Sequence, residues 1–154
     1  MKISCGILMY DNKKRKFLLV RPGGPFYKNK NIGIWTIPKG IKNEGEEAES
    51  AAKREFKEET GYSLSEKLNY LGEIRLRKSK KLIVYSTVGF IDACKIVSNS
   101  FEMEYPKNSG EYHSFPEIEE GGWYSFEEAR KLINPKLIVF LEKFKEKKRT
   151  DNNA

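Results

Sequence analysis

The sequence predicts an α+β or α/β sandwich in which a mixed β-sheet lies between helices. The first observation is the order of the periodic segments, which runs strands, one helix, more strands and then helices. The second is the length of 154 residues, which suits one domain with a single core. The third is a hydrophobic content of 38%, with 12% aromatic residues, which excludes a disordered chain.

The N-terminal part is predicted to hold two strands and a functional loop. Residues 2–10 and 16–21 have the pattern of strands, and the polar link between them makes a hairpin. The segment 21–33 is rich in Pro, Gly, Lys and Asn and is longer than a simple turn needs. Long ordered loops on a compact domain are enriched in function. A short strand is expected at 33–38 and ends at its proline.

The central helix is predicted at 46–60, with Gly61 at the position where a left-handed residue ends a helix. At 100° per residue, Glu55, Glu58 and Glu59 project within about 100° of one another. The same side carries the small apolar residues that should approach the sheet, which are Ala48, Ala51 and Ala52. The inner side of this helix therefore carries three carboxylates.

These three carboxylates need a compensating charge. Acidic neighbours at i, i+3 and i+4 repel by roughly 0.2–0.5 kcal/mol per pair when exposed, and by more when partly buried. Arg54 can reach Glu58, four residues later, but one arginine does not balance three carboxylates. A hard divalent cation such as Mg²⁺ or Mn²⁺ would do so. The alternative interpretation is a solvated acidic helix end with ordinary Glu–Lys pairs.

A second set of strands is expected after the central helix. Residues 68–77 and 82–92 alternate or run apolar, and a basic turn joins them as a second hairpin. Residues 101–105 form another short strand-like piece. A polar loop separates this piece from a last short strand at 123–125.

Two helices and a tail complete the predicted domain. Ser125 begins the first helix, because Glu128 follows three residues later as a capping box requires. The pair Asn134–Pro135 begins the second helix, with Pro at its first helical position. We expect a single domain over residues 1–148 and a frayed C-terminal tail at 149–154.

The net charge of +7 and the pI near 9.3 suit three kinds of partner: nucleic acid, an anionic membrane surface or a polyphosphate substrate. No apolar run approaches the ~20 residues of a membrane span, so no membrane association is expected. The N-terminus goes directly into a strand pattern without a signal peptide, which predicts a cytoplasmic protein. The expected assembly is a monomer or a homodimer.

The cysteines and the histidine indicate no zinc site or nucleophilic triad. Cys5 and Cys94 lie in strand-like apolar runs without metal-ligand spacing and are expected as reduced, buried thiols. His113 is the single histidine and lies in a polar loop. One histidine with no cysteine nearby excludes the common zinc patterns and leaves no obvious Ser-His-Asp arrangement.

The stretch from Gly40 to Tyr62 resembles the Nudix box, Gx₅Ex₇REUxEExGU, where U is a bulky apolar residue. Every fixed position matches, including Gly40, Glu46 and the run REFKEETGY that begins at Arg54. Both U positions, Phe56 and Tyr62, are aromatic here, where the family more often has an aliphatic residue. Outside the box, segments between residues 3 and 145 resemble a bacterial-type Nudix subgroup of predicted NTP pyrophosphohydrolases.

The resemblance implies an α/β/α sandwich and a hydrolase that uses Mg²⁺ or Mn²⁺ to cleave a nucleoside diphosphate linked to another group. It implies that Glu58 and Glu59 are the main metal ligands and that the Gly40 carbonyl joins them. Glu55 would be a further ligand or the general base. Arg54 would hold Glu58 or Glu55 in its working rotamer. Glu46 matches the first glutamate of the box, which more often has a structural role in the family.

In many Nudix enzymes a further carboxylate comes from a later loop. Glu104 is the candidate here for a catalytic base or extra metal ligand, and Glu102 is second to it. Glu117, Glu119 and Glu120 are expected on the loop surface. Trp35 could stack on a base or pack in the core. The candidate substrate-binding residues come from the loops and strand ends around the box and are Arg21, Lys39, Tyr27 and Tyr105.

The leading hypothesis is a divalent-metal-dependent pyrophosphohydrolase with a small-molecule nucleotide substrate. The first expected substrate is a dinucleoside polyphosphate such as diadenosine tetraphosphate, because the stretch WTIPKG is similar to stretches in hydrolases of that kind. A nucleoside triphosphate, ordinary or damaged, is the alternative, and a nucleotide sugar comes third. Two rivals are an RNA 5′-end or cap pyrophosphohydrolase and a non-catalytic binding domain. Nucleic acid is not the expected partner, since the chain lacks an arginine-rich or aromatic RNA-binding signature.

Overall fold

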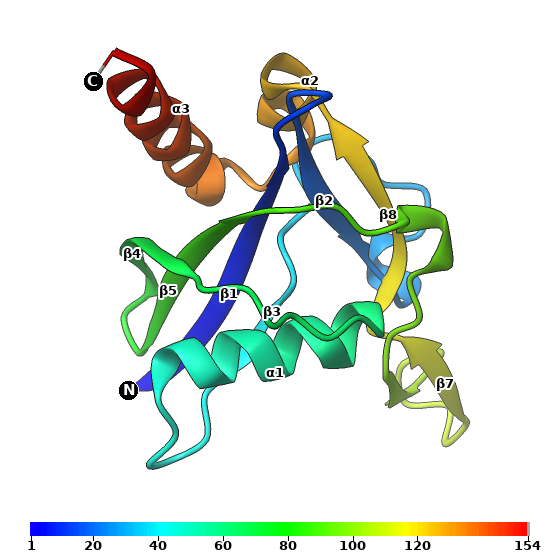
Figure 1. Cartoon of the computed structure of the whole chain (residues 1–154). Helices are drawn as coiled ribbons and strands as arrows, with labels where there is room; N and C mark the ends of the chain where they lie inside the picture. The colour runs from blue at the N-terminus through cyan, green and yellow to red at the C-terminus, as the bar shows by residue number, and fades with distance from the viewer. Residues whose placement is uncertain (154) are drawn as a thin grey trace.

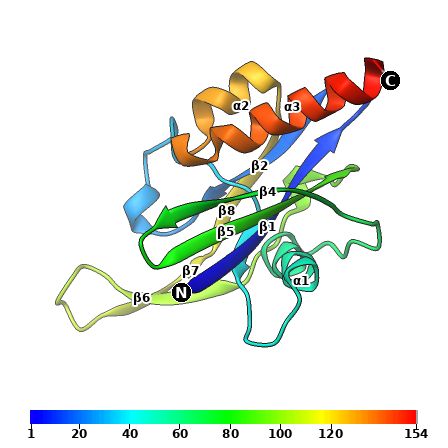
Figure 2. The same ribbon diagram turned by 90° about the vertical axis from the view of Figure 1, so that its left-hand side faces the viewer.

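A mixed six-stranded sheet forms the centre of the molecule, with α1 on one face and α2 and α3 on the other (Figures 1 and 2). The structure is a computed structural model and describes residues 1–153. The strand order is β4-β5-β1-β2-β8, and β3 pairs with part of β1. The strands of this sheet are β1 (Lys2–Asp11), β2 (Lys16–Pro22), β3 (Lys39–Ile41), β4 (Asn69–Arg77), β5 (Lys80–Val88) and β8 (Ile118–Tyr124).

A separate hairpin and three helices complete the fold. The hairpin consists of β6 (Ser100–Glu104) and β7 (Tyr112–Pro116), and it projects from one end of the sheet (Figure 2). The helices are α1 (Ala48–Thr60), α2 (Phe126–Leu132) and α3 (Ile138–Asn153). No helix in the described residues is both long and apolar enough to cross a membrane.

Strand β1 divides its side chains between two cores by simple alternation. Its odd-numbered apolar residues face α1, and its even-numbered ones face α2 and α3. The core beneath α1 includes Cys5, Ile7, Met9, Ala51, Ala52 and Phe56. The core beneath α3 includes Leu8, Tyr10, Phe17, Phe140, Leu141 and Phe144. Two apolar layers on one central strand confirm the predicted sandwich.

Strand β1 also changes its partner along its length. Ser4 to Gly6 pair with β3, whereas Tyr10 and Asp11 pair with β2. Gly40 of β3 therefore lies opposite Cys5, beside the central strand and under α1. The pairing of β3 with β1 therefore places Gly40, the first residue of the box-like stretch, against α1, which carries the glutamates of that stretch.

The predicted hairpins and the capping box are confirmed. Strand β1 joins β2, and β4 joins β5, through turns close to those expected. The Ser125 hydroxyl accepts the N–H of Glu128, and the Glu128 carboxylate accepts the N–H of Ser125. Helix α3 follows a short 3₁₀ turn at Pro135–Leu137 and continues to Asn153, past residue 148, after which we expected a frayed tail. Ala154 lies outside the described residues.

The strand predicted at 33–38 is wrong, because successive residues there bond to different partners. The Trp35 N–H donates to the carbonyl of Leu132, whereas Thr36 exchanges hydrogen bonds with Val20. No continuous ladder forms, and the strand begins only at Lys39.

Two further expectations are corrected by the structure. The segment expected as a polar loop before residue 123 contains β7 and most of β8. Both strands carry polar side chains at exposed positions, so apolar alternation does not reveal them. Cys94 is exposed rather than buried, because β5 ends at Val88 and the chain leaves the sheet before this residue. Cys5 is buried as predicted.

Candidate active site

Helix α1 lies close to the sheet because small residues form its inner face. Ala51, Ala52 and Phe56 are fully buried against the sheet. The helix ends at Gly61, which has a φ of 85° and donates its N–H to the carbonyl of Lys57. This left-handed end is the one that the sequence predicts. Glu55 and Glu59 are thereby held against the protein, whereas the side chain of Glu58 is 40% exposed.

Arg54 connects three glutamates and the loop before the helix. Its Nε and Nη2 donate to the two carboxylate oxygens of Glu46, at 2.9 and 3.0 Å. Nη1 donates to Glu55 Oε1 at 2.8 Å and to Glu58 Oε2 at 3.2 Å. Nη2 also donates to the carbonyl of Ile41 at 3.0 Å. The family resemblance implied one of Glu58 and Glu55 as the partner, and the structure brings Arg54 to both.

Glu46 anchors this arginine to the loop. Its Oε1 also accepts the backbone N–H of Asn43 at 3.0 Å. The hydrogen bonds from Arg54, and then the one from Asn43, lower the pKa of Glu46 to about 2. Glu46 is therefore ionised throughout the physiological range. Its contacts agree with the structural role that the family resemblance implies.

Glu59 turns toward β3. Its Oε1 accepts the backbone N–H of Lys39 at 3.0 Å. Desolvation is the main cause that raises the pKa of Glu59 to about 8, and the charges of Glu55 and Glu117 raise it further. The hydrogen bond and charge of Lys39 oppose this shift. Glu59 thus has a mostly buried carboxyl group that forms no salt bridge within residues 1–153. A bound cation would stabilise the ionised form of such a group.

Gly40 makes room for the Glu55 carboxylate. A Cβ added to Gly40 would lie 2.0 Å from Glu55 Oε2 and 2.1 Å from its Cδ. The side chain of Glu55 is only 13% exposed, and burial is the largest cause that raises its pKa. Only glycine at position 40 allows this carboxylate to rest against β3.

The donor set on α1 fits a hard divalent cation. Glu55, Glu58 and Glu59 offer carboxylate oxygens, and the close approach at Gly40 keeps backbone and carboxylate together. Within residues 1–153, no three His, Cys, Asp or Glu side chains converge closely enough to hold a metal ion. In this arrangement Nη1 of Arg54 lies between Glu55 and Glu58 and bonds to both.

The structure does not bring Glu104 to this cluster. Its carboxylate accepts the backbone N–H groups of Asn108 and Gly110, at 2.8 and 3.2 Å, and so stabilises the tip of the β6–β7 hairpin. The base of the hairpin touches α1, where the Asn99 N–H donates to the carbonyl of Glu58. Five residues of strand, at about 3.3 Å each, separate that base from Glu104. Glu104 therefore stabilises the hairpin tip and makes no hydrogen bond with the α1 carboxylates.

Glu117 is the outer carboxylate that sequence reasoning missed. It lies between β7 and β8, where its N–H donates to the carbonyl of Asn99 at 2.8 Å. Its charge acts on Glu59 and helps to raise the pKa of that residue. We expected Glu117 on the loop surface together with Glu119 and Glu120, and no local signal distinguishes it from them. Only the fold brings it near the helix.

The candidate substrate-binding residues fall at different places. Lys39 lies at the site through its backbone bond to Glu59. Arg21 forms a cross-strand ion pair with Glu120 at 3.0 Å. Tyr27 is half-buried in a 3₁₀ turn, and Tyr105 is 46% exposed beyond the end of β6. Trp35, for which two roles were open, is a core residue at 2% exposure, and its indole N–H donates to Asn31.

A mixed sheet between helices, with a glutamate-bearing helix held against the strand that contains Gly40, defines an α/β/α sandwich domain with a carboxylate cluster on one face. The family model of the NUDIX domain matches residues 2–144, so the chain belongs to the NUDIX domain family. Members of this family use divalent cations, generally Mg²⁺ or Mn²⁺.

Three similar proteins illustrate this membership. Nudix hydrolase 7 of Arabidopsis thaliana is 26% identical over 106 residues, which are 69% of this chain and 36% of that protein. A Bacillus subtilis protein, provisionally described as an 8-oxo-dGTP diphosphatase, is 35% identical over 80 residues, 51% of this chain and 49% of that protein. The structure of a C. elegans Ap4A hydrolase has a TM-score of 0.64 at 20% identity, covering 95% of this chain and 96% of that one. The chain thus spans from about a third to a half of the curated relatives' length.

Proposed function

We propose that this domain is a divalent-metal-dependent pyrophosphohydrolase that cleaves a phosphoanhydride bond in a nucleotide. The observation that carries this proposal is the face of α1, where Glu55 and Glu58 share one nitrogen of Arg54 and Glu59 forms no salt bridge within residues 1–153. Shielded carboxylates of this kind are costly unless a cation joins them. A structural role alone would be served better by apolar residues at the same positions.

Each residue of the site has a distinct role in the proposal. Glu58, Glu59 and Glu55 would hold the cation, together with the carbonyl of Gly40. When bound, the cation supplies charge neutralisation on the phosphates and a more acidic water. Arg54 fixes the rotamers of Glu55 and Glu58 through Nη1.

A base is also required for the attacking water. Glu55 and Glu117 are the candidates for this base. The negative charges of both carboxylates help to raise the pKa of Glu59, so both carboxylates lie close to it. Glu104, which we first considered, is engaged at the hairpin tip. Lys39, at the start of β3, would contact a substrate phosphate.

The substrate is proposed as a dinucleoside polyphosphate of the diadenosine tetraphosphate type. The stretch that ends in Lys39 supports this choice, and the fold neighbour from C. elegans hydrolyses Ap4A according to its description. A nucleoside triphosphate, including a damaged one, is the second candidate, supported by the Bacillus subtilis relative. An RNA 5′ end is the third, supported only by the net charge of +7.

The test is a substrate screen with two glutamate variants and one control. Wild-type protein is assayed on diadenosine tetraphosphate, nucleoside triphosphates and 5′-triphosphorylated RNA, with Mg²⁺, with Mn²⁺ and with a chelator. Products are separated by chromatography. Glu58→Gln or Glu59→Gln should lower kcat by at least about 10²-fold, which corresponds to about 2.7 kcal/mol of transition-state stabilisation. Their unfolding midpoints should stay near the wild-type value.

Glu47→Gln, at the residue just before the same helix, is the matched control. Glu47 is exposed, precedes the first helical residue and makes no side-chain capping bond. Its variant should keep turnover within about threefold of wild type, because it removes a carboxylate of the same chemistry outside the site. Near-normal turnover in both site variants, or no metal-dependent turnover of any phosphoanhydride, would reject the proposal.

A further inference from the structure

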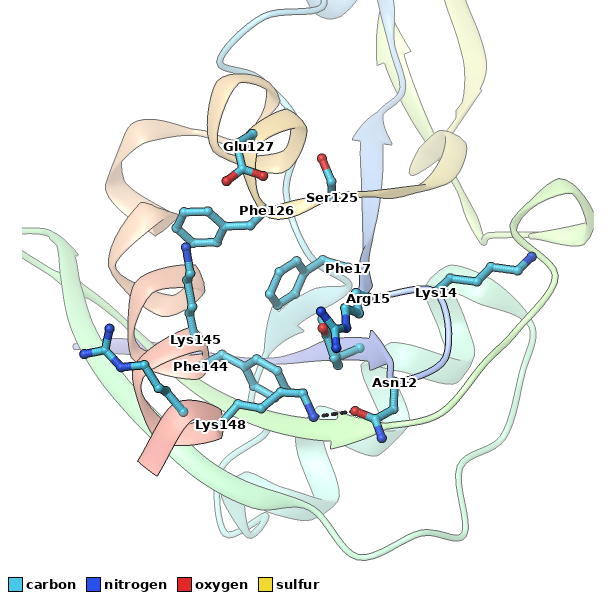
Figure 3. Close-up of a pocket in the computed structure, with 12 residues that line it drawn as sticks. Asn12, Lys14, Arg15, Phe17, Ser125, Phe126, Glu127, Phe144, Lys145 and Lys148 are labelled. Carbon is cyan, nitrogen blue, oxygen red and sulfur yellow. Dashed lines mark hydrogen bonds between the residues drawn. The ribbon is translucent and has the colours of Figure 1, made fainter. Parts of the chain in front are cut away.

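A cleft of about 790 Å³ opens on the face of the sheet opposite α1 (Figure 3). Its walls are the β1–β2 turn, the start of α2 and the C-terminal half of α3. Along β1, seven residues separate Cys5, the partner of Gly40, from Asn12 at the cleft. At about 3.3 Å per residue, the cleft is roughly 20 Å from the start of the glutamate site. It is therefore a separate site.

The cleft concentrates the positive charge of the chain. The basic residues that line it outnumber the acidic ones by five to one, and the acidic one is Glu127. The five basic residues are Lys14, Arg15, Lys145, Lys148 and Arg149. Arg149 is partly neutralised by Glu146 at 3.1 Å, although both side chains are mostly exposed and such a pair is weak. The residues that line the cleft therefore carry a formal net charge of +4.

Three of these cations remain available for an anion. Lys148 is held by the neutral side chain of Asn12, and Lys145 lies over the ring of Phe126 at 4.1 Å (Figure 3). Neither these two lysines nor Arg15 forms a salt bridge among the described residues. Lys14 differs, because it extends away from the cleft toward Phe90, at 5.7 Å from the ring.

Arg15 occupies a backbone position that favours glycine or asparagine. Its φ is 56°, which lies in the left-handed region and costs about 1 kcal/mol for a residue with a long side chain. The turn itself is fixed, because the Arg15 N–H donates to the carbonyl of Asp11 at 2.8 Å. The Asp11 carboxylate also accepts the N–H of Lys13. A glycine would satisfy this turn better, and the arginine found there instead brings a guanidinium to the lining of the cleft.

The floor of the cleft is aromatic. Tyr10, Phe17 and Phe144 pack together with ring centroids 4.9 to 5.5 Å apart. Phe126 forms part of the wall and is only half-buried. Tyr10, Phe17 and Phe144 are buried, so Phe126 is the lining ring that a planar base could reach among the basic side chains.

A second, smaller groove extends the basic surface beyond one nucleotide. It has a volume of about 230 Å³ and shares Phe144 and Lys148 with the cleft. Lys147 adds another cation, and Asp151 is the one acid that lines it. Because the two hollows share Phe144 and Lys148, they adjoin along α3, and an extended ligand can follow them while a single nucleotide would fill only one.

We infer that the cleft binds a single-stranded nucleic acid. Backbone phosphates contact Arg15, Lys145 and Lys148, and one base packs against Phe126 after Lys145 moves from its ring. A double helix is too wide and stiff for a cleft of this volume. A flat anionic membrane would meet the exposed cations but not the aromatic floor. The inference does not depend on the proposed hydrolysis, because the glutamate site lies on the other face of the sheet.

The test measures binding of a fluorescent single strand of about 12 nucleotides by anisotropy, as oligo-U RNA and as oligo-dT DNA. A chelator is present, so that the glutamate site is inactive. Three phosphate contacts predict a slope near −2 for log K against log salt, since each contact in a single strand contributes about −0.7. The double variant Arg15→Glu/Lys145→Glu should weaken binding at least about tenfold and flatten this slope.

A matched double variant separates this cleft from the total charge. Lys78→Glu/Lys107→Glu changes the net charge equally, and both lysines are exposed and outside the cleft, with Lys78 beside the opposite end of β1. This control should weaken binding by less than about threefold. An equal loss in both double variants would overturn the inference. Equally strong binding of a duplex, of tripolyphosphate or of phosphatidylserine vesicles would also overturn it, as would no binding of either strand at about 50 mM salt.

Discussion

Gly40→Ala tests whether the site depends on the close approach of β3 to α1. The added methyl carbon would lie 2.0 Å from Glu55 Oε2, whereas ordinary contact begins near 3.4 Å. The Glu55 carboxylate must therefore move by more than 1 Å, as a flexible side-chain end can do at small cost. The backbone at Gly40 is not in the left-handed region, so the alanine itself adds no strain there.

This movement should impair activity far more than stability. It pulls Glu55 from the 2.8 Å bond with Arg54 Nη1, a charge-assisted contact worth roughly 1.5–3 kcal/mol when well shielded. Solvent reaches the arginine, whose side chain is 29% exposed, so the loss in unfolding free energy should stay near the lower value. A displacement of about 1 Å at a catalytic group costs about 10²-fold in rate. We expect kcat/KM with Mg²⁺ to fall by that factor.

Gly45→Ala supplies the opposite case in the same loop. Gly45 has a φ of 79° and nothing within 4 Å of an added Cβ. Alanine there should cost about 1 kcal/mol of stability through backbone strain but keep turnover within about threefold. Urea unfolding and steady-state kinetics on the same preparations measure both quantities. The reasoning is refuted if Gly40→Ala keeps its activity, or if the two variants lose activity alike.

Three further outcomes are expected. Arg54→Lys should lower kcat at least about tenfold, because a single ammonium cannot bond to three glutamates and a carbonyl at once; steady-state kinetics measures this. Phe56→Ala should cost about 3–5 kcal/mol in urea unfolding, since its ring is fully buried. The bonds to Ser125 lower the pKa of Glu128, so its contribution to stability is present above its unfolded pKa and is lost as pH falls through the lower folded value. The stability difference between wild type and Glu128→Gln should therefore shrink in acid, and an increase there would contradict the capping contacts.

Local patterns predicted the elements whose causes are local. The 3.6-residue period placed three glutamates on one side of α1, and a glycine at position 61 marked its end. The spacing of Ser125 and Glu128 specified a capping box without any tertiary contact. In each case the sequence neighbours are also the physical partners. The partnership of Arg54 with Glu58 is of the same kind, since one helical turn separates them.

The features that escaped prediction depend on segments far apart in the chain. Glu117 comes near Glu59 only because β7 and β8 join beside the end of α1. The strands around it are polar at their exposed positions, so alternation does not mark them. The basic cleft needs Lys148 to meet Asn12, 136 residues earlier. The run of lysines near the C-terminus could have been a solvated helix end, and only the fold shows that it lines a cleft.

The bonds of Arg54 explain why the box-like stretch needs a glutamate before the helix. Two of its nitrogens are committed to Glu46 in a paired arrangement, and only Nη1 reaches Glu55 and Glu58. Glu46 stays ionised because its pKa is held at about 2. An arginine anchored by the helix glutamates alone would lose its position whenever a cation took their oxygens. Anchored to Glu46 and to the carbonyl of Ile41, the guanidinium keeps its place and can give up the Nη1 contacts. Because Glu46 precedes the helix, the groups that anchor Arg54 differ from the helix glutamates, Glu55 and Glu58, that Arg54 orients.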